Sequence, residues 1–166
     1  MFDKFGEFDS AEELNQKALE QREEGNEKEL LILCQENGID KEDAEDFMDG
    51  YMDELVNPLM AALGKLKAEC EDLKITGVLD DWVDELKSMC TESEEFARAV
   101  RKKGKGLDGF IALTADTGFK NRAVVDRRII NKTKQVKSVI GNHEFSIGIP
   151  NKAERKKLAN EYYLGK

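Results

Sequence analysis

The sequence is poor in the residues that interrupt helices and in those that cross-link a chain. It has two prolines, Pro58 and Pro150, so long helices can run without a break. It has three cysteines, Cys34, Cys70 and Cys90, which are widely spaced and form no Cys-x-x-Cys pair. An odd number of such cysteines is more typical of a reducing cytosol than of a disulfide framework. We therefore expect a helical protein without structural disulfides.

The residues that build metal centres and catalytic sets are scarce as well. His143 is the only histidine, whereas a metal site usually needs several His or Cys ligands at short spacing. The acidic stretch over residues 40–50 fails as a calcium-binding EF-hand loop, because Phe47 stands where an oxygen ligand is required. Gly104 and Gly106 lack the spacing of a phosphate-binding P-loop. We therefore expect no metal, no cofactor and no enzymatic activity.

Long hydrophobic runs are also missing. No apolar stretch of the sequence approaches the roughly 20 residues that a membrane-spanning helix needs. The first residues lack the basic and apolar regions of a secretory signal peptide. We therefore expect a cytoplasmic protein with no membrane partner.

Charge, by contrast, is abundant and unevenly distributed. Charged residues make up 37% of the chain, against about a quarter in typical globular domains. Residues 1–100 hold 29 acidic and 10 basic side chains, whereas residues 101–166 hold 6 acidic and 16 basic ones. This asymmetry predicts an acidic face and a basic face. Either the two faces neutralise each other within one fold, or one of them meets a partner of opposite charge.

Apolar residues recur at three- and four-residue steps along most of the chain, which is the pattern of amphipathic helices. The apolar stripe of the third helix is expected to continue through Gly50 to Leu55. Residues 75–90 are expected to form a helix with Val78 among its buried side chains, and a short helix is expected over residues 107–114. Helix starts are marked by residues that cap amide groups: Ser10, Asn26, Asp40, Asn57, residues 91–94 and Asn151.

The segment after residue 120 is less regular. Residues 124–131 fit a helix, and residues 134–149 hold β-branched residues with a possible turn at Gly141-Asn142. The predicted fold class is mostly α, a bundle of about seven to nine helices with a short β-hairpin near residues 134–149. The predicted organisation is an acidic N-terminal helical region over residues 1–73 and a C-terminal region over residues 74–166 with a basic face, or one compact unit.

Carboxylates are densest on and after the predicted third helix. One interpretation is a capped helix with a solvated face. The other is a surface that binds a partner through negative charge, steered by long-range attraction. The candidate partner-binding residues are Glu42, Asp43, Glu45, Asp46, Asp49, Asp53 and Glu54.

Cations gather in the second half of the chain over residues 101–105, and Lys132, Lys134 and Lys137 and then residues 152–157 extend them. One interpretation is a cationic helix end, where positive side chains complement the helix dipole. The other is a patch that contacts the phosphates of a nucleic acid. The candidate residues for this alternative are Arg101, Lys102, Lys103, Lys105, Lys152, Arg155 and Lys156.

Several stretches of the sequence resemble a family of proteins from Firmicutes mobile elements: residues 1–8, 45–51, 58–66, 96–105, 148–150 and 161–165. The chain resembles the PcfK-like family, which includes a type II-A anti-CRISPR family of Cas9 inhibitors. The C-terminal region is similar to PcfK, a conjugative-plasmid protein. The sequence departs from the family after the basic stretch. The family has a cysteine and a second apolar run there, whereas this chain has Phe110 and the polar residues 114–117.

The resemblance implies a protein that binds a Cas effector nuclease of the Cas9 type, or its ribonucleoprotein, and blocks DNA binding or cleavage. The acidic residues would then imitate phosphates. The alternative is an accessory protein of a mobile element that binds nucleic acid through its basic C-terminal half. Both hypotheses leave open whether the protein forms a homo-oligomer.

Overall fold

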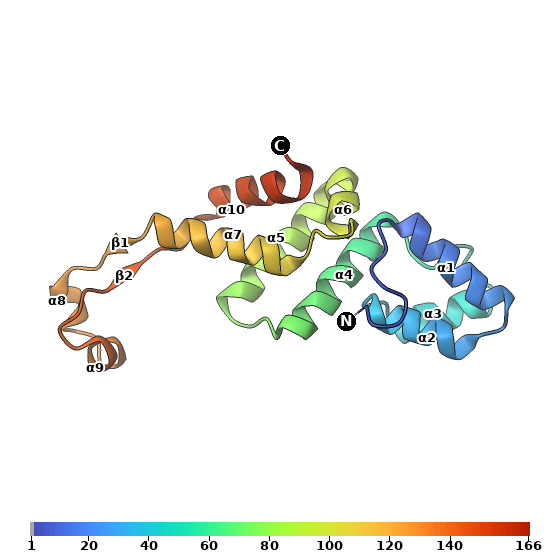
Figure 1. The fold of residues 1–166 in the computed structure, drawn as a ribbon, viewed down its shortest axis with the longest axis horizontal. Helices are drawn as coiled ribbons and strands as arrows, with labels where there is room; N and C mark the ends of the chain where they lie inside the picture. The colour runs from blue at the N-terminus through green and yellow to red at the C-terminus, as the bar shows by residue number, and fades with distance from the viewer. Residues whose placement is uncertain (1) are drawn as a thin grey trace.

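The computed structural model describes residues 2–166, which form ten α-helices, one π-helical turn and two short strands. Eight of the ten helices have eight residues or more. The molecule is elongated, with three helices at one end, a helical body in the middle and a thin arm at the other end (Figure 1). The fold is mostly α with a short antiparallel strand pair, which confirms the predicted class.

Three helices build the N-terminal end: α1 (Ala11–Glu23), α2 (Glu27–Glu36) and α3 (Lys41–Met48). Ser10 caps α1, because its hydroxyl accepts the Glu13 amide at 3.1 Å. The Glu13 carboxylate accepts the amide of Asp9 and not that of Ser10, so the reciprocal half of the capping box is displaced by one residue.

The body is built from five helices: α4 (Pro58–Leu73), α5 (Val78–Glu92), α6 (Glu94–Arg101), α7 (Leu107–Lys120) and α10 (Lys152–Ala159), which continues as the π-helical turn η1 (Asn160–Leu164). Side-chain caps are present at Asn57 and Asn151, as the sequence predicts. In the predicted capping box over residues 91–94 the cap is Ser93 and not Thr91, whose hydroxyl donates to the Lys87 carbonyl within α5. Because each cap satisfies amides that the first turn leaves unpaired, these helix starts are fixed by local sequence.

Two apolar clusters form the interior. The first lies among α1, α2, α3 and the start of α4, and it includes Leu33 and Phe47. The second lies among α4, α5, α6, α7 and α10, and it includes Trp82. Helix α4 contributes Ala61 to the first cluster and Ala62 to the second. The predicted acidic and basic regions are therefore joined through one shared helix.

The arm leaves the body between α7 and α10 and carries four short elements: β1 (Ala123–Val124), α8 (Arg127–Ile130), α9 (Gln135–Ile140) and β2 (Ser146–Ile147). The strands are antiparallel, with Ala123 opposite Ile147 and Val124 opposite Ser146. The strand pair joins residues 123–124 to residues 146–147, so only its second strand falls within the predicted hairpin region.

Local details of the arm differ from the sequence-based prediction. Within residues 124–131, which were predicted to be helical, only α8 is helix, and Val124 is extended in β1. Residues 135–140 are helical, because the Thr133 hydroxyl accepts the Lys137 amide at 3.1 Å and starts a helical turn. Gly141, with φ of +54°, ends α9 rather than forming a hairpin turn with Asn142.

The helix boundaries in the rest of the chain need three corrections. Helix α3 ends at Met48, because Gly50 has a φ of +80° and the Tyr51 amide donates back to the Asp46 carbonyl. The predicted stripe therefore does not continue as helix to residue 55. Helix α5 begins only at Val78, whose side chain is exposed. Helix α7 is longer than predicted and ends at residue 120.

Two predicted caps are not formed. The side chains of Asn26 and Asp40 make no capping hydrogen bond to α2 and α3. Asn26 donates instead to the Glu24 carboxylate. Asp40 forms an ion pair with Lys67 on α4, with its Oδ1 2.7 Å from Nζ. These tertiary and local partners compete with the helix amides for the same side chains.

Candidate protein-binding surface

The seven acidic residues singled out from the sequence lie on α3 and on the turn that follows it, at the end of the molecule opposite the arm (Figure 1). Six are exposed and Asp43 is partly buried. Within residues 2–166, Glu45 is the only one in an ion pair, and its partner Lys41 lies on the same helix. We call this surface the acidic face: Glu42, Asp43, Glu45, Asp46, Asp49, Asp53 and Glu54.

The spacing of these carboxylates places like charges next to one another. Glu42, Asp46 and Asp49 follow at steps of four and three residues along α3 and its C-terminal end. Such neighbours are roughly 5–6 Å apart at Cβ, and like charges in this arrangement destabilise a helix by a few tenths of a kcal/mol per pair. No cation from residues 101–166 pairs with them. A cationic partner would relieve this repulsion.

Side chains from α1 fix the turn that carries Asp49, Asp53 and Glu54. Arg22 Nη1 donates to the carbonyls of Phe47 and Met52, both at 3.1 Å, and its guanidinium lies 4.2 Å from the centre of the Phe47 ring. Asn15 exchanges two hydrogen bonds with the backbone of Val56, at 2.8 and 2.9 Å. The acidic face is therefore held on an ordered backbone. Neither Arg22 nor Asn15 is among the residues predicted from the sequence.

Other carboxylates of the acidic half form hydrogen bonds with backbone amides of the same chain. The N-terminal strap, residues 2–9, runs between the three-helix end and the body (Figure 1). Glu36 on α2 accepts the Lys4 amide at 2.7 Å, and Asp9 accepts the Lys103 amide at 3.1 Å. Some carboxylates of the acidic half therefore hold the strap and the loop after α6 in place. Those of the acidic face make no such contact with the described part of the fold.

A buried ion cluster lies where the strap meets the body. The side chain of Lys65 on α4 is fully buried, and its Nζ is 2.6 Å from a Glu7 oxygen and 3.9 Å from a Glu69 oxygen. The same ammonium donates to the carbonyls of Lys102 at 2.7 Å and Lys105 at 3.3 Å. Lys65 therefore joins α4, the strap and the loop between α6 and α7.

The two carboxyl groups beside Lys65 have opposite pKa shifts. Burial raises the pKa of Glu69 to about 7, although the Lys65 charge and the Leu107 amide act against it. Burial also opposes the charge on Glu7, but hydrogen bonds from Lys65 and the Gly104 amide outweigh it, so the Glu7 pKa is lowered. Glu7 is therefore the main counter-charge of Lys65 at neutral pH.

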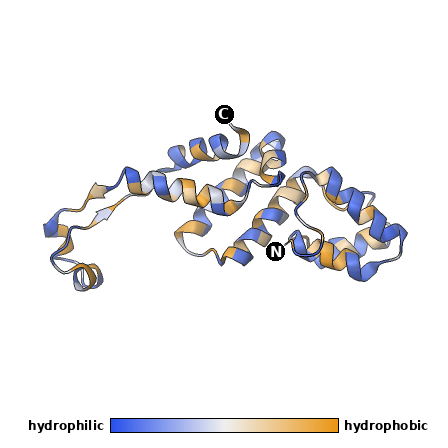
Figure 2. Cartoon of the chain, viewed as in Figure 1, coloured by the Kyte–Doolittle hydropathy of each residue, from blue (hydrophilic) through white to orange (hydrophobic). Residues whose placement is uncertain are grey.

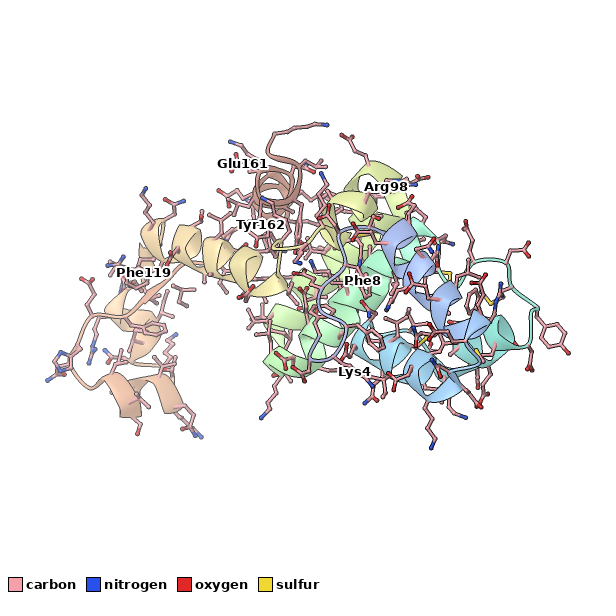
Figure 3. All side chains as sticks on the ribbon, turned by 45° about the vertical axis from the view of Figure 1, so that its right-hand side comes forward. Lys4, Phe8, Arg98, Phe119, Glu161 and Tyr162 are labelled. Atoms are coloured by element: carbon pink, nitrogen blue, oxygen red, sulfur yellow. The ribbon has the colours of Figure 1, made fainter. Side chains whose placement is uncertain are left out.

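Arg101, a member of the predicted basic patch, is inside the protein. It is 1% exposed, and its Nη2 donates to Asn37 Oδ1 at 2.8 Å. Its guanidinium lies 5.9 Å from the ring centres of Phe2 and Phe8, and Phe8 is seen on the strap in Figure 3. Burial lowers the pKa of Arg101 to about 10, so it remains protonated at neutral pH. It cannot contact a nucleic acid from this position.

The remaining residues of the predicted patch lie on two elements, and the side chains of two of them form hydrogen bonds within the protein. Lys105 Nζ donates to the Tyr162 carbonyl at 2.8 Å. Arg155 is bound by the Glu85 carboxylate through two nitrogens. Lys102 and Lys103 are exposed on the loop after α6, whereas the exposed Lys152 and the partly buried Lys156 lie on α10. Internal partners therefore take up the arginines and Lys105 of the predicted patch, whereas a patch made of its exposed lysines stays a prediction.

The structure also bears on metal sites, reactive cysteines and membrane-spanning helices. Within residues 2–166, no three His, Cys, Asp or Glu side chains are placed to hold a metal ion. Burial raises the pKa of the Cys34 and Cys90 thiols to about 12, so these cysteines are unreactive at neutral pH. No helix in this part of the chain is both long enough and apolar enough to cross a bilayer.

Comparison with protein-family models, with curated proteins and with solved structures gives no match to this chain. Membership of the PcfK-like and anti-CRISPR families therefore stays a prediction from the quoted sequence stretches. Function has to be inferred from the surfaces of the molecule.

Proposed function

We propose that this chain is a binding protein that inhibits a Cas9-like nuclease by placing its acidic face in a channel meant for nucleic acid. The observation that supports the proposal most is the exposed row of carboxylates on α3 and its following turn, which have no cation from the basic half as a partner. The resemblance of several sequence stretches to a family of Cas9 inhibitors also supports a Cas9-like nuclease as the partner.

The chemistry of such a channel suits the acidic face. Cas9-type nucleases hold the guide–target duplex in positively charged channels through its backbone. Carboxylates on a rigid surface can accept charge-assisted hydrogen bonds from the lysines and arginines that otherwise bind phosphates. Attraction between opposite charges would also speed the encounter, and it would weaken with added salt.

Neutralising the acidic face tests the proposal. We expect the chain to inhibit target cleavage by a Cas9–guide RNA complex. The triple variant Asp46→Asn, Asp49→Asn, Asp53→Asn should raise the concentration needed for inhibition about 100-fold, taking roughly 1 kcal/mol per charge. Asparagine keeps the size of the side chain, so the fold is unaffected. Inhibition is read from cleavage of a labelled target over a titration of the protein.

A matched variant controls for net charge. Asp80→Asn, Asp116→Asn and Glu144→Gln remove three exposed carboxylates from α5, α7 and the arm. This control should inhibit within about twofold of the unmodified chain, because surface charges away from a contact change affinity little. If both triple variants inhibit equally well, or if the chain inhibits none of several Cas9 proteins, the proposal fails.

The alternative function, nucleic-acid binding through Arg101, Lys102, Lys103, Lys105, Lys152, Arg155 and Lys156, has less support. Arg101 is buried and Arg155 is bound by Glu85, so these two strongest candidates are not available to phosphates. Lys102, Lys103 and Lys152 are exposed and form no ion pair within residues 2–166, and a further group of unpaired lysines lies on the arm.

A further inference from the structure

The arm, residues 119–149, is built differently from the rest of the molecule. It projects beyond the helical body as two antiparallel connections with α8 and α9 at its tip (Figure 1). Among its described side chains only Ile130 is a buried large apolar residue. A segment with so little core of its own contributes little to folding, so its length and composition call for another explanation.

Charge on the arm is opposite to that of the whole chain. The chain has a net charge of -9, yet residues 119–149 contain seven lysines and arginines and only two carboxylates. Asp126 forms an ion pair with Arg128, and Arg127 is held by the carbonyl of Gly141 at the tip. The exposed lysines of the arm, however, have no anionic partner within residues 2–166: Lys120, Lys132, Lys134 and Lys137.

Apolar and aromatic side chains accompany these lysines. Figure 2 shows hydrophilic and hydrophobic segments next to one another along the arm. Phe119 is at the base of the arm (Figure 3), where the Arg122 guanidinium lies 4.1 Å from the centre of its ring. Further exposed apolar side chains on the arm are Val124, Ile129, Val139, Ile147 and Ile149.

The base of the arm is fixed by the close approach of two backbones. A Cβ added to Gly148 would lie 1.8 Å from the Gly118 carbonyl oxygen, and one added to Gly118 would lie 2.5 Å from the Gly148 oxygen. Both glycines are therefore required for the two connections to leave the body side by side. The arm is thus a projection with a defined base and not an arbitrary loop.

We infer that the arm binds double-stranded DNA, with its lysines against the phosphate backbone. The major groove of B-DNA admits an α-helix or a β-ribbon, and the thin arm presents the short helices α8 and α9 at its tip with Lys132, Lys134 and Lys137 on or beside them. The major groove of double-stranded RNA is too narrow for protein side chains to read. Lysines supply sequence-independent affinity, and exposed aliphatic side chains can pack on base edges or between base steps.

The rest of the molecule is compatible with this binding. The acidic face is at the opposite end of the long axis (Figure 1). At physiological salt, charges are largely screened beyond a Debye length of about 8 Å, so the repulsion between the acidic face and DNA is weak. The inference uses different residues from the proposed inhibitor function and does not depend on it.

Fluorescence anisotropy of the full chain with a labelled duplex of arbitrary sequence tests the inference. We expect binding that weakens steeply between about 50 and 200 mM salt, as it does when several phosphates are neutralised. The variant Lys132→Gln, Lys134→Gln, Lys137→Gln should bind at least tenfold more weakly, and its log–log salt slope should be smaller by about 3. Circular dichroism checks that the variant is folded.

A second triple variant separates the arm from net charge. Lys28→Gln, Lys67→Gln and Lys74→Gln remove the same charge from exposed positions on the other elements, and this variant should bind DNA within about twofold of the unmodified chain. Equal weakening by both variants would overturn the inference, as would no binding of DNA at the lowest salt. Tighter binding of double-stranded RNA or of poly-glutamate than of DNA would also overturn it, the latter in favour of an acidic protein partner.

Discussion

Replacing Lys65 by methionine is expected to lower the free energy of unfolding by about 3–5 kcal/mol, the usual cost of removing one partner from a buried ion pair. Methionine fills a similar volume, so the loss reflects charge and hydrogen bonding. The substitution leaves Glu7 without its ammonium partner and deprives the carbonyls of Lys102 and Lys105 of a donor. Urea denaturation followed by circular dichroism measures the change.

The same helix supplies the control for this prediction. Lys67 lies two residues further on, and its ammonium pairs with Asp40 where both side chains are exposed. Exposed pairs contribute about 0–1 kcal/mol, so Lys67→Met should change stability far less than Lys65→Met. The double variant Lys65→Met, Glu7→Gln should recover part of the loss, because the partner's charge is removed as well. Equal effects of the two single variants would contradict the assigned role of Lys65.

Replacing Gly64 by alanine is the second change with a large expected effect, and its sign is informative. In an exposed helix the substitution stabilises by about 1 kcal/mol through helix propensity. Here a Cβ on Gly64 would lie 2.3 Å from the Asn37 carbonyl oxygen, and Gly38 opposite it has a φ of +66°. Both neighbours are backbone and cannot rotate away.

We therefore expect Gly64→Ala to destabilise the protein by about 2 kcal/mol or more, in the upper part of the range for overpacking a core. The end of α2 would have to move away from α4, which also disturbs the hydrogen bond between Asn37 and Arg101. Thermal and urea unfolding would both show the loss. An unchanged or increased stability would mean that α2 and α4 do not approach each other this closely.

The sequence was a good guide wherever the determinant is local. Caps at Ser10, Asn57 and Asn151 were predicted because cap and amide are two or three residues apart. Apolar periodicity likewise predicted the long helices, since one buried stripe follows from the helical repeat. The mostly α fold was therefore accessible before any coordinates.

Long-range pairing was not accessible in the same way. Arg101 carries the same charge and stands in the same basic run as Lys102, yet only the fold brings Asn37 and the strap aromatics around it. Strand β1 is two residues long, and its partner β2 follows only after two intervening helices. Neither the burial of one cation nor the pairing of such short strands leaves a periodic signal in the sequence.

The acidic candidates could be named from the sequence because charge density is a local property. What holds them in place could not, because Arg22 and Asn15 reach Phe47, Met52 and Val56 from another helix. The residues of the acidic face are thus a prediction from composition, whereas their ordered arrangement is a result of the fold.

The two charged ends of the molecule would have different roles in binding to a nuclease. The acidic face would compete with the target DNA for the channel, whereas the arm carries charge of the opposite sign on the far side of the body. Removing the arm lysines should therefore leave competition at the channel intact, while neutralising the acidic face should abolish it.

The most direct test of the acidic-face mechanism is an equilibrium competition between the chain and labelled target DNA for a Cas9–guide RNA complex, followed by anisotropy at two salt concentrations. If the acidic face stands in for phosphates, the chain displaces the DNA, displacement weakens with salt, and the Asp46→Asn, Asp49→Asn, Asp53→Asn variant needs a concentration about 100-fold higher to displace it. If the chain binds the complex while the DNA stays bound, or if displacement is unaffected by salt and by this variant, the mechanism is wrong.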